Sequence, residues 1–216
     1  MAAADTSSPR ERYRAQVREE IKEHAREQIA TAGASALSLN AISKRMGMSG
    51  PALYRYFASR DALITELVKD AYRSLAGTFH DCAAAGGDLP ALARALRDWA
   101  LADPHRYFLV YGTPVPGYRA PEDTTLIAAE IMSVLLAACA AEDAPDAAAA
   151  GLDEHLAQHR TWAEDPADPP ARLRRALLCW TRLHGVLSLE LAGHFTGMGL
   201  DPSVLYDAEV RSLAAR

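Results

Sequence analysis

The sequence predicts an all-α protein in which an N-terminal helix-turn-helix domain of three helices precedes a larger helical bundle. Three observations favour this fold class. Apolar residues recur at spacings of three and four along most of the chain, which is the period of a helix with one buried face. The alternating pattern of a half-buried strand is nearly absent. The 216 residues suffice to bury a core, in one domain or in a small domain joined to a larger one.

The first helix is predicted to end at Ala32, because Gly33 follows it as a C-terminal cap. Its apolar residues lie four apart and therefore share one face: Val17, Ile21, Ala25 and Ile29. The expected divisions of the chain are a flexible tail at 1–9, the helix-turn-helix domain at 10–60 and the helical body at 61–216.

Two short helices follow in the pattern of a helix-turn-helix. Ser38 is the expected N-cap of the second helix, and Gly47 is the left-handed residue that closes it. Pro51 falls in the first turn of the third helix, where its missing N–H costs nothing. Leu53 and Phe57 are four apart and are expected to face inward. A helix this short is stable only when it packs, and its outer face is left for a partner.

Charge is distributed unevenly along the chain. Residues 1–75 contain twelve Lys and Arg against nine Asp and Glu, whereas residues 76–216 contain eleven against nineteen. The basic first part suits an approach to phosphates, and the acidic remainder is kept away from them. In a helix-turn-helix, the N-terminal residues of the second helix of the motif contact base edges in the major groove. Small residues there, Ser49, Gly50 and Ala52, permit close approach.

The run LSLNAISKRMGMSGPALYRYFASRDALITEL, residues 37–67, resembles the DNA-binding signature of the tetracycline-repressor (TetR) family of bacterial transcription regulators. The resemblance covers about residues 12–68. It implies that Ser38, Tyr56 and Arg60 contact phosphates, and that five residues contact base edges or the thymine methyl group: Asn40, Gly50, Pro51, Ala52 and Tyr54. Tyr56 stands where the family usually has His, Arg60 stands where it usually has Lys, and Gly50 offers no side chain to a base.

The full set of residues expected at double-stranded DNA is Ser38, Asn40, Lys44, Ser49, Gly50, Pro51, Ala52, Tyr54, Arg55, Tyr56 and Arg60. Two alternatives stay open at this point. The same helix-turn-helix packing occurs in proteins that bind no DNA, in which case the LYRYF segment is a hydrophobic plug. Lys44 also fits an ordinary solvated helix face.

The body is predicted to contain further helices, of which the first links it to the helix-turn-helix domain. The expected ranges are 61–85, 89–102, 104–111, 122–141, about 152–162, 170–193 and a last helix from residue 202. The Gly- and Pro-rich segment GTPVPGYRAP, which follows residue 111, is expected to be a loop.

The sequence contains no recognisable motif for catalysis, for metal binding or for a cofactor. Cys82, Cys139 and Cys179 lie far apart and fit small core residues. His155 and His159 have a spacing that suits one helix face, but the general-base Glu of a zinc protease motif is missing between them, and a solvated pair is expected. No span reaches the length of a membrane helix and no signal peptide is recognisable. We therefore expect a cytoplasmic protein that is no enzyme, has no membrane partner and needs no cofactor.

The helix at 170–193 is apolar on two faces, and one of them is expected to meet a second copy of the chain. Cys179, Leu183 and Val186 form the stripe assigned to this dimer seam. The resemblance supports a homodimer, because the TetR family dimerises through its last two major helices. The segment WTRLHGVLSLELAGHF also resembles the Trp-x3-His-Gly stretch of one C-terminal subtype of the family.

Large side chains of the body are candidates for the wall of a ligand pocket: Phe79, Trp99, Phe108, Tyr111, Met132, Trp180 and His184. Each fits an ordinary core residue equally well. The expected function is that of a repressor which binds a palindromic operator as a homodimer and releases it when a small, mainly apolar effector binds. The alternatives are an enzyme or carrier that uses the helical body, and an activator or chromosome-organising protein without an effector.

Overall fold

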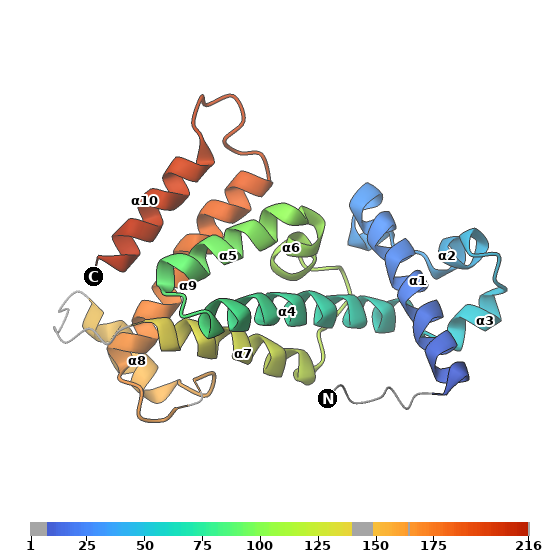
Figure 1. Cartoon of the computed structure of the whole chain (residues 1–216), viewed down its shortest axis with the longest axis horizontal. Helices are drawn as coiled ribbons and strands as arrows, with labels where there is room; N and C mark the ends of the chain where they lie inside the picture. The colour runs from blue at the N-terminus through green and yellow to red at the C-terminus, as the bar shows by residue number, and fades with distance from the viewer. Residues whose placement is uncertain (1–7, 140–148, 164, 216) are drawn as a thin grey trace. The chain divides into compact units, whose positions relative to one another are not determined.

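The computed structural model describes residues 8–139, 149–163 and 165–215. Within these ranges every regular element is a helix, as predicted (Figure 1). The elements are α1 (Pro9–Ala32), the 3₁₀ helix η1 (Ala34–Ala36), α2 (Leu39–Arg45), α3 (Gly50–Tyr54), α4 (Arg60–Ala84), α5 (Leu89–Ala102), α6 (Pro104–Tyr111), α7 (Glu122–Ala138), α8 (Ala150–Gln158), α9 (Pro170–Leu191) and α10 (Pro202–Ala214). No helix among these residues is both long and apolar enough to cross a bilayer.

The chain forms two compact units. The first consists of Met1–Asp70 and His105–Ala120, and the second consists of Ala71–Pro104 and Pro121–Arg216. The predicted division at residue 60 placed α6 and the following loop with the body, whereas the contacts group them with α1, α2 and α3. The long helix α4 begins in the first unit and ends in the second. Of the predicted tail, residues 1–7 lie outside the described residues, and Ser8 caps α1.

The core of the first unit contains the residues predicted to face inward. Ile21, Ala25, Ile42, Leu53 and Phe57 are all buried. The ring of Phe57 also lies under a cation, because the guanidinium carbon of Arg18 is 4.4 Å from the ring centroid. Short helices that bury such residues gain the stability that their length alone does not provide.

The second unit is organised around α9, which contacts α5, α7, α8 and α10. Polar bonds fix two of these pairings. The hydroxyl of Tyr206 on α10 donates to the carbonyl oxygen of Ala93 on α5 at 2.7 Å, and Arg97 on α5 forms an ion pair with Glu190 on α9 at 2.6 Å. Of the three cysteines, Cys139 and Cys179 are buried as predicted, whereas Cys82 is only half-buried.

The prediction that the stripe with Leu183 forms the dimer seam is wrong, whereas a dimer through another face of α9 stays a prediction. Cys179, Leu183 and Val186 are all buried within one chain, so they belong to the core of the second unit. The error arose because α9 packs on four neighbouring helices, and the sequence alone does not tell which apolar stripe they cover. The apolar residues that remain exposed on α9 are Leu178 and Leu189.

Candidate nucleic-acid interface

The helix-turn-helix is built by three local capping arrangements. The side chain of Ser38 accepts a hydrogen bond from the backbone N–H of Ala41, and the side chain of Ser49 accepts one from that of Ala52. Gly47 has φ of +64° between the two helices, a conformation that glycine adopts without steric cost. The roles of Ser38 and Gly47 are the predicted ones, whereas the capping role of Ser49 was not predicted. Together these features set α3 after α2 with a turn of four residues.

The outer face of α3 is accessible. Pro51, Tyr54 and Arg55 are exposed, and Tyr54 retains 47% of its surface accessible. The buried Leu53 lies on the opposite face, as the sequence predicted. Gly50 and Ala52 are half-buried and leave the N-terminal end of α3 without bulky side chains. A partner can therefore approach the backbone closely at this end and meet aromatic and cationic side chains beside it.

Most cations of the first unit are engaged within the protein. Arg18 pairs with Glu66, Lys22 pairs with Glu19 and Asp70, and Arg45 pairs with Glu27 at 2.7 Å. Lys44 and Arg55 are exposed and form no ion pair with any described residue. Lys44 on α2 and Arg55 at the end of α3 are therefore available for phosphates.

Arg60 is turned towards the protein backbone. Its Nη2 donates to the carbonyl oxygens of Ala34 at 2.8 Å and Ser35 at 3.1 Å, and its Nε donates to that of Leu37 at 3.2 Å. Nη1 makes none of these bonds and lies 3.5 Å from a carboxylate oxygen of Asp61. Arg60 therefore holds η1 and the start of α2, and its predicted phosphate contact stays a prediction.

The remaining predicted contacts divide by exposure. Asn40 and Ser49 are exposed, while Ser38 and Tyr56 are half-buried. Ser38 and Ser49 use an oxygen lone pair as N-caps, and each hydroxyl keeps its hydrogen for an acceptor such as a phosphate oxygen. The backbone carbonyl of Tyr56 accepts from Nη1 of Arg18 at 2.7 Å, which ties the end of the motif to α1.

The side chains predicted to line a ligand pocket are divided between the two units. Phe108 and Tyr111 belong to the first unit, and Phe79, Trp99, Met132, Trp180 and His184 belong to the second. Phe79 and Trp99 are buried, and Nε1 of Trp99 donates to the hydroxyl of Ser74 at 3.1 Å. Trp180 and His184 contact each other, with ring centroids 4.1 Å apart. Packing in the core of the second unit explains the burial of Phe79 and Trp99 without a ligand.

The prediction that the two histidines of the 155–159 segment lie at the surface is confirmed. His155 and His159 are both exposed, and their rings stack at a centroid distance of 4.1 Å. Nδ1 of His159 lies 3.1 Å from the carbonyl oxygen of His155, so local backbone contact accounts for the arrangement.

The two short capped helices α2 and α3, joined by a tight turn and with the outer face of α3 exposed, place the chain in the class of helix-turn-helix proteins. Comparisons with known proteins identify the family. Residues 21–67 match the bacterial regulatory proteins of the tetR family, and residues 89–213 match the tetracyclin repressor-like C-terminal domain. The chain belongs to the TetR family of transcriptional regulators, whose members are not enzymes. The Trp-His-Gly subtype predicted for the C-terminal part is not confirmed by this match.

Individual relatives agree with this assignment. The HTH-type transcriptional regulators Rv1816 of Mycobacterium tuberculosis and Mb1846 of Mycobacterium bovis are each 37% identical over 217 residues, covering 94% of this chain and 92% of the relative. The crystal structure of the regulatory protein SCO4313 is 65% identical, with a TM-score of 0.90, and covers 97% of this chain and 100% of that one. A Rhodococcus sp. RHA1 protein of unknown function shares the fold at 21% identity and a TM-score of 0.65.

Proposed function

We propose that the chain is a cytoplasmic repressor that binds a palindromic operator as a homodimer and releases it when a small, mainly apolar effector binds. The observation that carries the DNA-binding part is the outer face of α3, where Tyr54 and Arg55 are exposed next to a small-residue N-terminal end. Side chains in this position of a helix-turn-helix reach base edges and the phosphates at the walls of the groove.

The direct DNA contacts we propose are the predicted ones, since each of these residues is exposed or half-buried. Asn40, Pro51, Ala52 and Tyr54 face the bases together with the backbone at Gly50, and a second group contacts phosphates: Ser38, Lys44, Ser49, Arg55 and Tyr56. Arg60 holds the carbonyl groups of η1, and its Nη1 is proposed to contact a phosphate as well.

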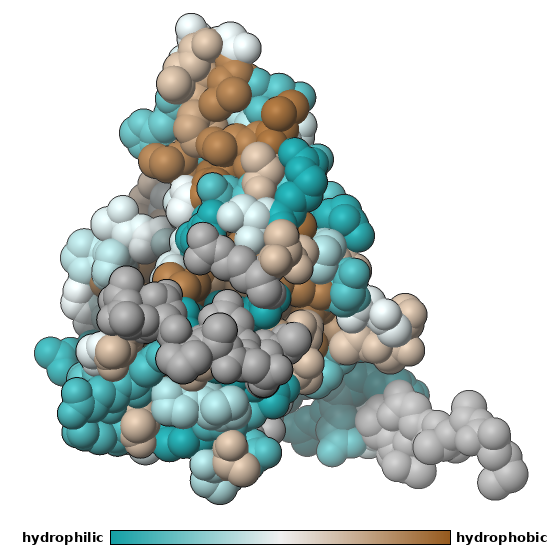
Figure 2. Space-filling view, turned by 90° about the vertical axis from the view of Figure 1, so that its left-hand side faces the viewer, coloured by the Kyte–Doolittle hydropathy of each residue, from teal (hydrophilic) through white to brown (hydrophobic). Residues whose placement is uncertain are grey.

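The homodimer is proposed to form through the exposed apolar residues of α9 and α10. Leu178, Thr181, Gly185 and Leu189 are exposed and follow one another at spacings of three, four and four along α9, so they share one face. Val204 on α10 is 59% exposed. In Figure 2, hydrophobic atoms gather at the top, where Figure 1 places the upper part of α10 and the segment before it. An exposed apolar patch of this kind marks a protein interface, and the symmetric pairing of two copies would cover it.

Selection of binding sites from random double-stranded DNA by the purified full chain tests this proposal. Enrichment of one palindromic sequence is the expected result. Enrichment of AT-rich DNA of any sequence would favour the architectural alternative, and an absence of enrichment would contradict DNA recognition by the exposed face of α3.

A further inference from the structure

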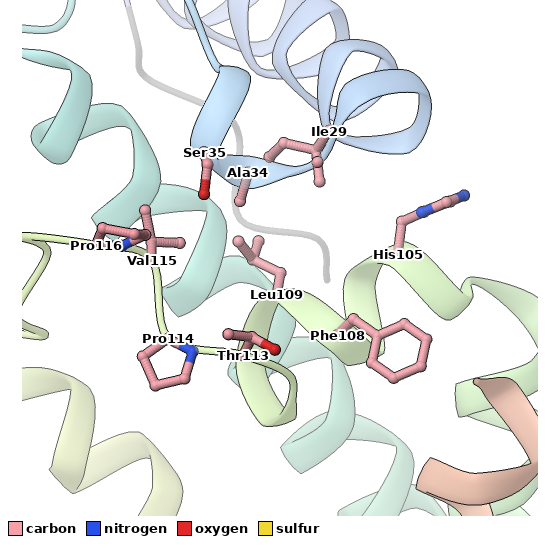
Figure 3. Close-up of a pocket in the computed structure, with 11 residues that line it drawn as sticks. Ile29, Ala34, Ser35, His105, Phe108, Leu109, Thr113, Pro114, Val115 and Pro116 are labelled. Atoms are coloured by element: carbon pink, nitrogen blue, oxygen red, sulfur yellow. The ribbon is translucent and has the colours of Figure 1, made fainter.

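A cavity of about 340 Å³ opens within the first unit, between the end of α1 with η1 on one side and α6 with its following loop on the other. Figure 3 shows Ile29, Ala34 and Ser35 on one wall, facing Leu109 and Val115 on the other. Its volume falls at the lower end of the range of small-molecule sites, about 300–1,000 Å³. None of the second-unit residues predicted to line a ligand pocket contributes to it, whereas Phe108 does.

The loop wall of the cavity is held in place from several sides. α6 ends directly before Gly112, whose N–H donates to the carbonyl oxygen of Phe108 at 3.0 Å. A Cβ at Gly112 would come within 2.4 Å of that oxygen, so only glycine permits this turn. Further along, the hydroxyl of Tyr118 lies 3.2 Å from Oγ1 of Thr65 on α4. The ring of Phe108 packs edge-on against the buried Tyr107 at 5.6 Å between centroids.

The lining combines apolar walls with a few hydrogen-bonding groups. Ile29, Phe108, Leu109 and Val115 supply hydrocarbon surface, while Ser35, Thr113 and His105 supply two hydroxyls and an imidazole. The hydroxyl of Ser35 points towards the opposite wall (Figure 3). None of the residues that line the cavity is acidic. Beside this wall, the guanidinium of Arg60 donates to the carbonyls of Ala34 and Ser35 and pairs with Asp61 at 3.5 Å. A carboxylate in the cavity would therefore meet the hydroxyls of the lining rather than an unpaired cation.

The same wall is connected to the DNA-binding motif by covalent and hydrogen bonds. η1 ends at Ala36, two residues before Ser38, which caps α2. The backbone N–H of Ser38 donates to Oε1 of Gln28 at 2.9 Å, and Arg60 links Ala34, Ser35 and Leu37. A molecule that pushes η1 away from α6 would therefore displace the N-terminal end of α2.

We propose that this cavity is the effector site of the regulator and that its ligand is a small, mainly apolar carboxylic acid. The inference rests on the proposed function for its effect on DNA. The hydrocarbon part would pack between Ile29 and Leu109, and the carboxylate would accept hydrogen bonds from Ser35 and Thr113 at the open side. Because bound ligand displaces η1, it lowers operator affinity, and by linkage the operator lowers ligand affinity by the same factor.

The test uses 1-naphthoate as the probe and isothermal titration calorimetry of the full chain. Two variants fill the cavity from opposite walls, Leu109→Trp and Ser35→Trp, and the second leaves the backbone carbonyl held by Arg60 unchanged. Leu126→Trp is the matched control, because Leu126 lies on α7 in the second unit and is 69% exposed. Thermal unfolding and probe-free operator binding establish that each variant is folded.

The expected result is at least a tenfold loss of 1-naphthoate affinity in both cavity variants and wild-type affinity in the control. The probe should also weaken operator binding by the wild type and leave the cavity variants unaffected. Equal affinity for all four proteins, or no binding to the wild type at millimolar probe, would overturn the site. Probe binding that leaves operator affinity unchanged would overturn its effector role. If the wild type binds no operator at all, the proposed function is contradicted. The calorimetric comparison of the four proteins still decides whether the cavity binds the acid.

Discussion

Single residues on α3 differ in how much of their surface is still available for a partner. Leu53 is fully buried, whereas Tyr54 on the neighbouring position keeps 47% of its surface exposed. We predict that Tyr54→Ala weakens operator binding by about 1–3 kcal/mol, the range for the loss of one good base contact. Fluorescence anisotropy with labelled operator measures this loss, and Tyr54→Phe separates the contribution of the hydroxyl from that of the ring. Unchanged affinity in both variants would contradict the docking of α3 against bases.

Arg60 and Arg55 form a matched pair of arginines with opposite expected effects. Arg60→Ala removes three hydrogen bonds to backbone carbonyls and should lower the free energy of unfolding by about 1.5–3 kcal/mol, the range for bonds to a charged group. Arg55 is exposed, and Arg55→Ala should leave stability unchanged while it reduces the salt dependence of operator affinity by about one unit of slope. Thermal unfolding and salt titrations measure the two effects. A destabilised Arg55 variant beside an unaffected Arg60 variant would reverse these assignments.

His184 on α9 makes the stability of the second unit depend on pH. Its Nε2 atom is inaccessible to solvent, and burial lowers the pKa of His184 from 6.5 to about 4. The unfolded chain takes up the proton near pH 6.5, while the native chain takes it up only near pH 4. The free energy of unfolding should therefore fall as the pH drops from about 6.5 to about 4, by about 3 kcal/mol in total, at about 1.4 kcal/mol per pKa unit.

A His184→Gln variant isolates this contribution from the titration of carboxylates over the same range. Denaturant unfolding at several pH values between 7 and 4 should give a flatter curve for the variant than for the wild type. Parallel curves would mean that His184 binds protons equally well in the native and unfolded states.

At the scale of elements, most helix bounds could be predicted from the sequence because local signals specify them. Gly33 and Gly47 adopt the positive φ that ends a helical run, and Ser38 and Pro51 begin new ones as expected. The predicted ranges of α5 and α6 agree with the structure at both ends. Periodicity and capping are properties of short segments, so they can be recognised without knowledge of the tertiary contacts.

Contacts between segments that are distant in the sequence could not be predicted in the same way. Which stripe of α9 is buried depends on the neighbouring helices, and the direction of the Arg60 side chain depends on η1, which is 25 residues away in sequence. The grouping of His105–Ala120 with the first unit likewise follows from packing between distant segments. The cavity beside η1 had no sequence signal apart from Phe108, since small and polar residues such as Ala34, Ser35 and Thr113 carry no pattern of their own.

The two faces of α9 give the sharpest prediction at the element scale. Leu183 is buried within one chain, whereas Leu189 is 45% exposed. Leu189→Glu should therefore yield folded monomers if this face makes the dimer, because a charge would lie in an apolar interface. Leu183→Ala should instead lower the free energy of unfolding by about 2–5 kcal/mol, the usual cost of truncating a buried leucine. Analytical ultracentrifugation and unfolding experiments measure these effects. A Leu189→Glu protein that remains dimeric would place the interface elsewhere.

At the scale of the whole molecule, a symmetric dimer would present two copies of α3 to one side of the duplex. A helix-turn-helix dimer binds half-sites whose centres lie about 34–36 Å apart, or a multiple of that distance. The selected operator should therefore be a palindrome with this spacing. Lengthening the spacer by half a helical turn should abolish tight binding, because it would turn one half-site to the opposite face of the duplex.

In the proposed mode of binding, recognition of the operator requires both half-sites and two chains. Operator affinity of the full chain is measured by fluorescence anisotropy at fixed salt, on the selected palindrome and on the same DNA with one half-site scrambled. The wild type should prefer the intact palindrome by at least tenfold, and Leu189→Glu should bind both DNAs with the same low affinity. Equal affinity of the wild type for the intact and the half-scrambled operator would contradict the claim.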